Sequence, residues 1–181
     1  MKEEDLYKLR FPIGAFIKPE TITEQHISSW IIAIENLPKS IESLTNNLNT
    51  NALNYKYRPD GWTIKQVVHH CADSHINSLM RFKLTLTEKQ PIIRPYFEDR
   101  FAKLIDYSEP IDTSLFILKG VHHKLSVLLR NLNREELDLK FIHPEHGKNF
   151  SLKETIGMYA WHSNHHLEHI KQALKFKNKF S

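Results

Sequence analysis

Four long stretches of the chain carry apolar residues at every third or fourth position, which is the spacing of an α-helix with one buried face. These stretches cover residues 22–48, 64–90, 113–131 and 152–176. Within the first stretch, Pro38 predicts a break, because proline lacks the backbone N–H that an interior helical residue donates. We therefore expect two helical pieces there, over residues 22–36 and 40–48.

The capping residues and prolines at the boundaries of these stretches support the helical interpretation. Thr63 with Gln66, and Ser151 with Glu154, match the capping-box pattern that marks a helix start. Pro91 and Pro95 predict an extended connection, followed by a short helix over residues 97–105 and, after 131, a loop around 143–147. Glycine is scarce and long Val/Ile alternations are absent, which argues against a β fold.

Four amphipathic helices in a chain of this length predict an all-α fold, a four-helix bundle. We expect it to fill residues 1–181 as a single domain, with an N-terminal extension and at least one long crossover connection. Helix bundles often place metal sites in the core, where side chains from facing helices meet.

Composition and charge narrow the classes of partner. The formal net charge of +4 comes from lysines scattered along the chain, and the one dense group, after residue 170, complements a helix C-terminus. We therefore expect no nucleic-acid partner. The chain has one cysteine, an N-terminus without an apolar signal segment and no run of about 18 apolar residues. These features predict a cytoplasmic protein with no membrane partner.

Two of the twelve histidines lie on the inward face of the helix predicted over 152–176. With His166 at zero on a wheel of about 100° per residue, Tyr159 falls at about +20° and Ile170 at about +40°. His162 falls at about −40°, inside the same apolar face. Burying two histidines on a core stripe is costly unless they have a partner.

The spacing of His162 and His166 suits a metal ion. Because they are four residues apart, their imidazoles project one turn apart from one face and can converge on one ion at about 2.0–2.1 Å. The helical zinc motif His-Glu-x-x-His uses the same spacing, although that motif is absent here. His165 and His169 fall towards the edge of the face. A metal site on this helix needs a third ligand.

The helix predicted over 64–90 offers three candidates for that ligand. With Cys71 on the apolar stripe at zero, His69 falls at about 160° and is expected in solvent, whereas His75 falls at about +40° on the core face. His70 falls at about −100°, at the edge. Periodicity slightly favours His75 and does not settle the choice.

Four stretches carry a family pattern: Gly61 to Glu88, residues 9–14 (Leu-Arg-Phe-Pro-Ile-Gly), 93–96 (Ile-Arg-Pro-Tyr) and 159–166 (Tyr-Ala-Trp-His-Ser-Asn-His-His). They span nearly the whole chain. Together they resemble the DinB/YfiT-like superfamily of metal-dependent bundle proteins, and within it the YfiT-type branch, whose members are regarded as metal-dependent hydrolases.

The resemblance implies a set of metal ligands. In that superfamily the first ligand follows a Trp by eight residues in a His-Leu-Ala-Asp-like motif, which corresponds here to His70 after Trp62. The other two form a His-x-x-x-His pair, which corresponds to His162 and His166. Cys71 stands where Leu is commoner, and its place on the apolar stripe predicts a buried structural thiol. The resemblance also implies a homodimer.

Three protein ligands leave one coordination position open, as in catalytic zinc sites. An ion with an open position can acidify a bound water or bind a thiol as thiolate, so the ligand set does not choose between hydrolysis and S-transfer. Because the resemblance is to metal-dependent hydrolases, the expected function is metal-dependent hydrolysis of a small-molecule substrate, with a metal-bound water as nucleophile. Two alternatives stay open: a transferase that joins a low-molecular-weight thiol of the bacillithiol type to an electrophile, and a non-enzymatic metal-binding stress protein. Three imidazoles accept several divalent ions; we expect one ion per chain, zinc first and nickel second.

The sequence assigns no general acid or base. Asp73 and Glu168 are secondary candidates for orienting an imidazole or carrying a proton. Glu168 also stands where the YfiT-type branch often has a small residue. Arg81, Arg94 and Tyr96 are secondary candidates for contacting an anionic substrate near the mouth of the bundle.

Overall fold

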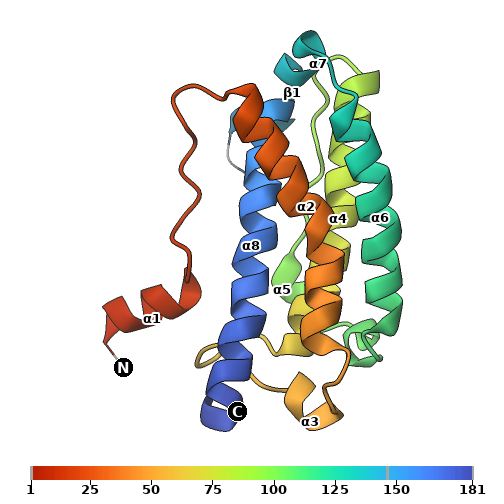
Figure 1. The fold of residues 1–181 in the computed structure, drawn as a ribbon. Helices are drawn as coiled ribbons and strands as arrows, with labels where there is room; N and C mark the ends of the chain where they lie inside the picture. The colour runs from red at the N-terminus through yellow and green to blue at the C-terminus, as the bar shows by residue number, and fades with distance from the viewer. Residues whose placement is uncertain (1, 146, 181) are drawn as a thin grey trace.

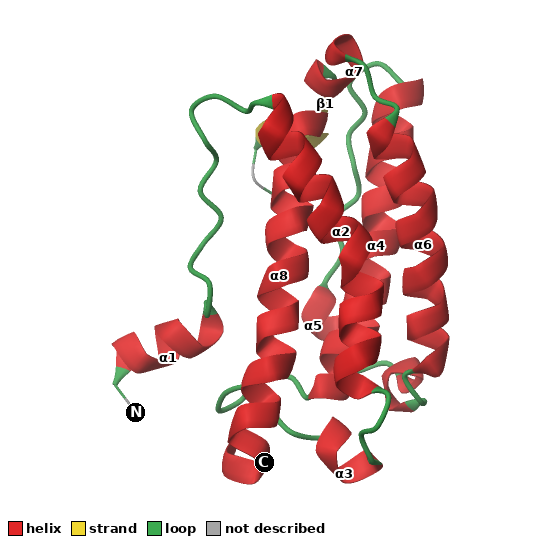
Figure 2. Cartoon of the chain, in the orientation of Figure 1, coloured by secondary structure: helices red, strands yellow, loops and turns green. Residues whose placement is uncertain are grey.

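The computed structural model describes residues 2–145 and 147–180, so the outer ends of the predicted domain 1–181, and His146 in the predicted loop, lie outside the described residues. Helices dominate it (Figure 2). The elements in chain order are α1 (Glu3–Arg10), α2 (Glu24–Thr45), α3 (Thr50–Leu53), α4 (Ile64–Thr87), α5 (Glu98–Phe101), the 3-10 helix η1 (Ile105–Ser108), α6 (Asp112–Arg130), α7 (Arg134–Asp138), β1 (Lys140–His143), β2 (Lys148–Ser151), α8 (Leu152–Phe176) and the 3-10 helix η2 (Lys177–Phe180).

The four long helices α2, α4, α6 and α8 form the bundle. Helix α2 packs against α8 and α6, and α4 packs against the same two helices, so α2 and α4 are diagonal to each other. Figure 1 shows α2 and α8 running in one direction and α4 and α6 in the other. The connection from α4 to α6 therefore travels the length of the bundle through α5 and η1, which is the predicted long crossover.

Helix α2 continues through Pro38, so the predicted break there is wrong. Proline removes the N–H that would bond to the Ile34 carbonyl four residues earlier. That carbonyl is satisfied instead by His122 of α6, whose Nδ1 donates to it at 2.6 Å. A side chain from the neighbouring helix thus replaces the missing backbone donor. The helix ends at Thr45, short of the predicted residue 48.

A small antiparallel hairpin precedes α8 where the sequence predicted only a loop. Strands β1 and β2 pair Phe141 with Phe150 and His143 with Lys148. Four-residue strands are too short to show a clear alternation of apolar and polar residues. The predicted short helix over 97–105 is shorter, as α5, and η1 follows it. The capping box at Thr63 is confirmed, and the Ser151 side chain caps α8 by accepting from the Glu154 N–H.

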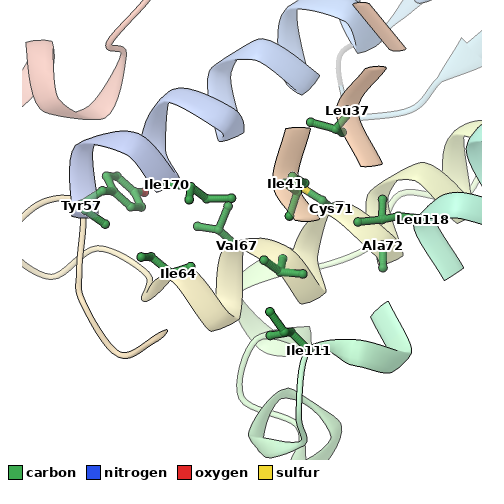
Figure 3. Close-up of a cluster of buried hydrophobic side chains, with 12 residues drawn as sticks. Leu37, Ile41, Tyr57, Ile64, Val67, Cys71, Ala72, Ile111, Leu118 and Ile170 are labelled. Atoms are coloured by element: carbon green, nitrogen blue, oxygen red, sulfur yellow. The ribbon is translucent and has the colours of Figure 1, made fainter. Parts of the chain in front are cut away.

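The core consists of two apolar clusters at opposite ends of the bundle. One gathers residues such as Leu37, Val67 and Ile170 (Figure 3), and the other gathers Ile34, Phe82 and Ile156 with their neighbours. Along α4, α6 and α8 the residues between the two clusters include several buried histidines. The bundle therefore has a layer of imidazoles between two apolar layers.

The N-terminal extension lies along α8 (Figure 1). Its residues 9–14 are held by side chains of that helix: Trp161 Nε1 donates to the Gly14 carbonyl at 3.0 Å, and Gln172 Nε2 donates to the Leu9 carbonyl at 2.9 Å. We call residues 9–14 the N-terminal strap. Among the described helices, none combines the length and the apolar character needed to cross a membrane.

Candidate metal centre

Three imidazoles converge in the histidine layer. His70 projects from α4, and His162 and His166 project from α8, with one nitrogen from each ring within 4.8 Å of the others. The Nε2 atoms of His70 and His162 lie 3.2 Å apart. Two imidazoles bound to one tetrahedral ion at about 2.05 Å would have their nitrogens about 3.3 Å apart. A direct N–H···N bond also fits this distance, so the third imidazole at the same point is what indicates an ion.

Burial prepares these imidazoles to act as ligands. Desolvation, as the largest cause, lowers the pKa of His70 to about 4 and holds the pKa values of His162 and His166 well below the usual range for histidine. The neighbouring imidazoles lower them further. All three rings are therefore neutral near neutral pH and have a lone pair to offer, which is the protonation state that metal binding requires. The donor set fits a divalent first-row ion.

A second histidine, His75 of α4, lies behind His162. Its Nε2 is 3.2 Å from Nδ1 of His162, and its ring stacks on His122 with centroids 4.6 Å apart. His75 is fully buried and is not among the three converging imidazoles. The hydrogen bond on Nδ1 decides which nitrogen of His162 faces His70. Periodicity had slightly favoured His75 as a ligand; its position suits a supporting role.

The next turn of α8 supports His166 in the same way. His169 donates from Nε2 to the Arg10 carbonyl of the N-terminal strap at 3.1 Å, which leaves its Nδ1 as an acceptor 3.4 Å from Nδ1 of His166. His165, His166 and His169 form a second group whose nitrogens lie within 4.8 Å of one another. The role of His169 depends on its hydrogen bond to the strap. The sequence does not show where the strap lies, so this role could not be predicted from it.

Two cavities reach the centre from different sides, and His162, Trp161 and Glu98 line both of them. The first has a volume of about 360 Å³ and contains His70 and His166 in its wall. The second has a volume of about 280 Å³ and extends from His162 towards Arg81. A small molecule can therefore approach the three imidazoles, which the sequence pattern alone could not establish.

The secondary candidates lie in different surroundings. The Asp73 carboxylate accepts from the Tyr107 hydroxyl at 2.7 Å, and Glu168 pairs with Lys171 at 2.8 Å near the surface. Neither contact orients an imidazole of the triad. Arg81 and Tyr96 line the second cavity. Arg94 is exposed and lines neither cavity.

Two further expectations for α4 have different outcomes. His69, expected in solvent, is buried: its Nδ1 lies 2.8 Å from the Ser114 hydroxyl, and its Nε2 bonds to the Glu109 carbonyl at 3.1 Å. The expectation failed because the crossover and α6 cover this face of α4. The periodicity of α4 alone does not show these neighbours. Cys71 is fully buried in the apolar cluster, as predicted, and burial raises the pKa of its thiol.

Comparison with known proteins places these features in a family. The sequence model described as the DinB superfamily matches residues 33–170. A Bacillus cereus (strain 03BB102) protein named "Putative metal-dependent hydrolase" is 46% identical over 94% of this chain and 98% of its own. A protein of the same description from Bacillus thuringiensis subsp. konkukian has the same identity and coverage. The solved structure of YfiT from Bacillus subtilis, described as "a probable metal-dependent hydrolase with an unusual four-helix bundle topology", matches with a TM-score of 0.89 and 37% identity, covering 93% of this chain and 97% of its own.

Proposed function

Because this chain belongs to the DinB superfamily, we propose that it is a metal-dependent hydrolase in which His70, His162 and His166 hold one divalent ion. The convergence of these three neutral imidazoles at the meeting point of two cavities supports the proposal most strongly. The names of the similar Bacillus proteins point to the same class of reaction. Zinc is the first candidate for the ion and nickel the second.

A divalent ion at this site would supply a Lewis acid and would lower the pKa of a coordinated water towards neutrality. The chain's own side chains do the rest. His75 and His169 orient His162 and His166, respectively, by contacting the Nδ1 atom of each. Trp62 lies against His70 with ring centroids 4.7 Å apart and shields that ligand from solvent.

The polar groups beside the centre favour a polar reacting group over a purely apolar one. The Ser74 hydroxyl lies 3.5 Å from Nε2 of His162 and shares the second cavity with Tyr96 and Tyr159. Burial raises the pKa values of both tyrosines, so both phenols stay protonated and can donate hydrogen bonds to a substrate oxygen. These donors suit an ester or amide carbonyl.

The test is a panel of esters, amides and electrophiles with zinc-loaded protein, with and without an added low-molecular-weight thiol. Hydrolysis without thiol that disappears in His162→Ala is the expected result. Turnover only with thiol would replace the proposal by an S-transferase. No turnover by a fully loaded protein across the panel would leave a non-enzymatic metal-binding protein.

A further inference from the structure

The second cavity combines apolar walls with one basic side chain. Its apolar wall consists of Phe16, Pro95, Met158 and the ring of Trp161, and Arg81 lies at one side. With a volume of about 280 Å³, it is large enough for a small organic molecule. Since His162 also lines it, a molecule bound there would lie next to the metal centre.

The charge of Arg81 is not balanced by a carboxylate. None of the ion pairs among the described residues includes this side chain. Its Nε is buried without an acceptor in the described part of the chain, and Nη1 donates to the Tyr159 hydroxyl at 3.0 Å. By contrast, Arg130 on the surface of α6 pairs with Glu35. A half-buried cation normally has an anionic partner, and Arg81 has none among the described residues.

The guanidinium is also held in place. Tyr159, which accepts from Nη1, is itself buried and lies on the long helix α8. A guanidinium fixed on one side leaves its remaining donors in a defined direction, which suits the planar, two-oxygen geometry of a carboxylate. Two carboxylates, Glu98 and Glu145, line the same cavity and repel an anion, so a bound carboxylate has to lie close to Arg81.

We propose that the second cavity is a subsite for an organic carboxylate: Arg81 binds the carboxylate of a small substrate, and the apolar wall receives its hydrocarbon body. The substrate class is then an ester or amide that also bears a free carboxylate. Calling the ligand a substrate rests on the proposed function, whereas the binding of the carboxylate does not.

The test is binding of benzoate and of its neutral analogue benzamide to the full-length, zinc-loaded protein, measured by titration calorimetry. We expect benzoate to bind more tightly than benzamide. In Arg81→Gln benzoate affinity should fall at least about tenfold, because a charge-assisted pair is lost, and Arg81→Lys should recover part of it. Arg94→Gln is the matched control: it makes the same charge change on an exposed residue outside the cavity and should leave affinity unchanged.

Several results would overturn the subsite. These are no measurable benzoate binding to the wild type, equal affinity for benzamide, or unchanged benzoate affinity in an Arg81→Gln protein. Tighter binding of phenylphosphonate than of benzoate would overturn the assignment to a carboxylate. Repeating the titration on metal-free protein distinguishes binding at Arg81 from binding at the metal ion. If benzoate affinity is lost when the metal is removed but is kept in Arg81→Gln, the carboxylate binds the ion. Retained, Arg81-dependent binding in a protein without any turnover would uphold the subsite and count against the hydrolase.

Discussion

Nδ1 of His162 lies 3.2 Å from Nε2 of His75, while Nε2 of the same ring lies 3.2 Å from Nε2 of His70. The two histidines of α4 therefore contact opposite sides of one imidazole. Only one of them can share an ion with the Nε2 lone pair of His162. The other accepts a hydrogen bond from the Nδ1–H group of His162. This bond fixes the tautomer in which Nε2 is unprotonated and can bind a metal.

We predict that His75→Ala keeps the metal site but weakens it. Without an acceptor for its Nδ1–H group, His162 loses its preferred tautomer and orientation. Metal affinity should therefore fall about 10- to 100-fold. His75→Gln, whose amide oxygen can still accept, should recover part of the loss. Competition with a chromophoric chelator measures the affinities. Equal affinity in His75→Ala and the wild type would show that His75 does not support His162.

The N-terminal strap should affect metal affinity through His169. In His169→Ala the link from His166 to the Arg10 carbonyl is lost, and we expect affinity to fall by about tenfold. Gln172→Ala is the matched control, because it removes contacts with the Leu9 and Tyr57 carbonyls without touching His166. If both variants weaken metal binding equally, the strap acts only by general stabilisation.

The metal-free protein should lose stability in mild acid. Burial lowers the pKa of His122 to about 4 from 6.5, so between these values the unfolded chain binds more protons than the folded one. The free energy of unfolding therefore falls as pH falls through this window, by about 2 kcal/mol for this residue between about pH 7 and about pH 5. Urea unfolding of His122→Gln should show a flatter dependence. His123→Gln, on the exposed side of α6, should not.

Gly157 marks the close approach of α8 to α2. A Cβ built there would lie 2.9 Å from the Trp30 ring, closer than a methyl group can pack. Gly157→Ala should therefore destabilise the protein by about 1–3 kcal/mol. In Gly120→Ala, where nothing lies within 4 Å, the better helix propensity should stabilise by roughly 0.5–1 kcal/mol. Thermal unfolding compares the two, and equal effects would exclude a steric origin.

The bundle and the pair on α8 could be predicted because each depends on local periodicity. His162 and His166 stand where the helical pattern calls for apolar residues, and the structure places both in the central layer. The third imidazole could not be chosen by periodicity, because α4 is buried around most of its circumference. His69, His70 and His75 are all buried, so no one face of the helix identifies the site.

Tertiary contacts explain the features that the sequence did not show. Pro38 predicts a break by itself, and only His122 from another helix supplies the missing donor. His169 owes its role to the strap, which is more than 150 residues away in the chain. The place of Arg81 beside His162 likewise depends on how α4 and α8 pack.

The most direct test of the three-histidine metal centre is the metal content per chain of untagged wild-type protein, beside His70→Ala, His162→Ala, His166→Ala and His75→Ala, all loaded with excess zinc and then desalted. We expect one ion per chain in the wild type, its loss in the first three variants and its retention in His75→Ala, where all three ligands are intact. A wild type that cannot be loaded, or metal kept in His70→Ala and lost in His75→Ala, would show that His70, His162 and His166 do not hold the ion.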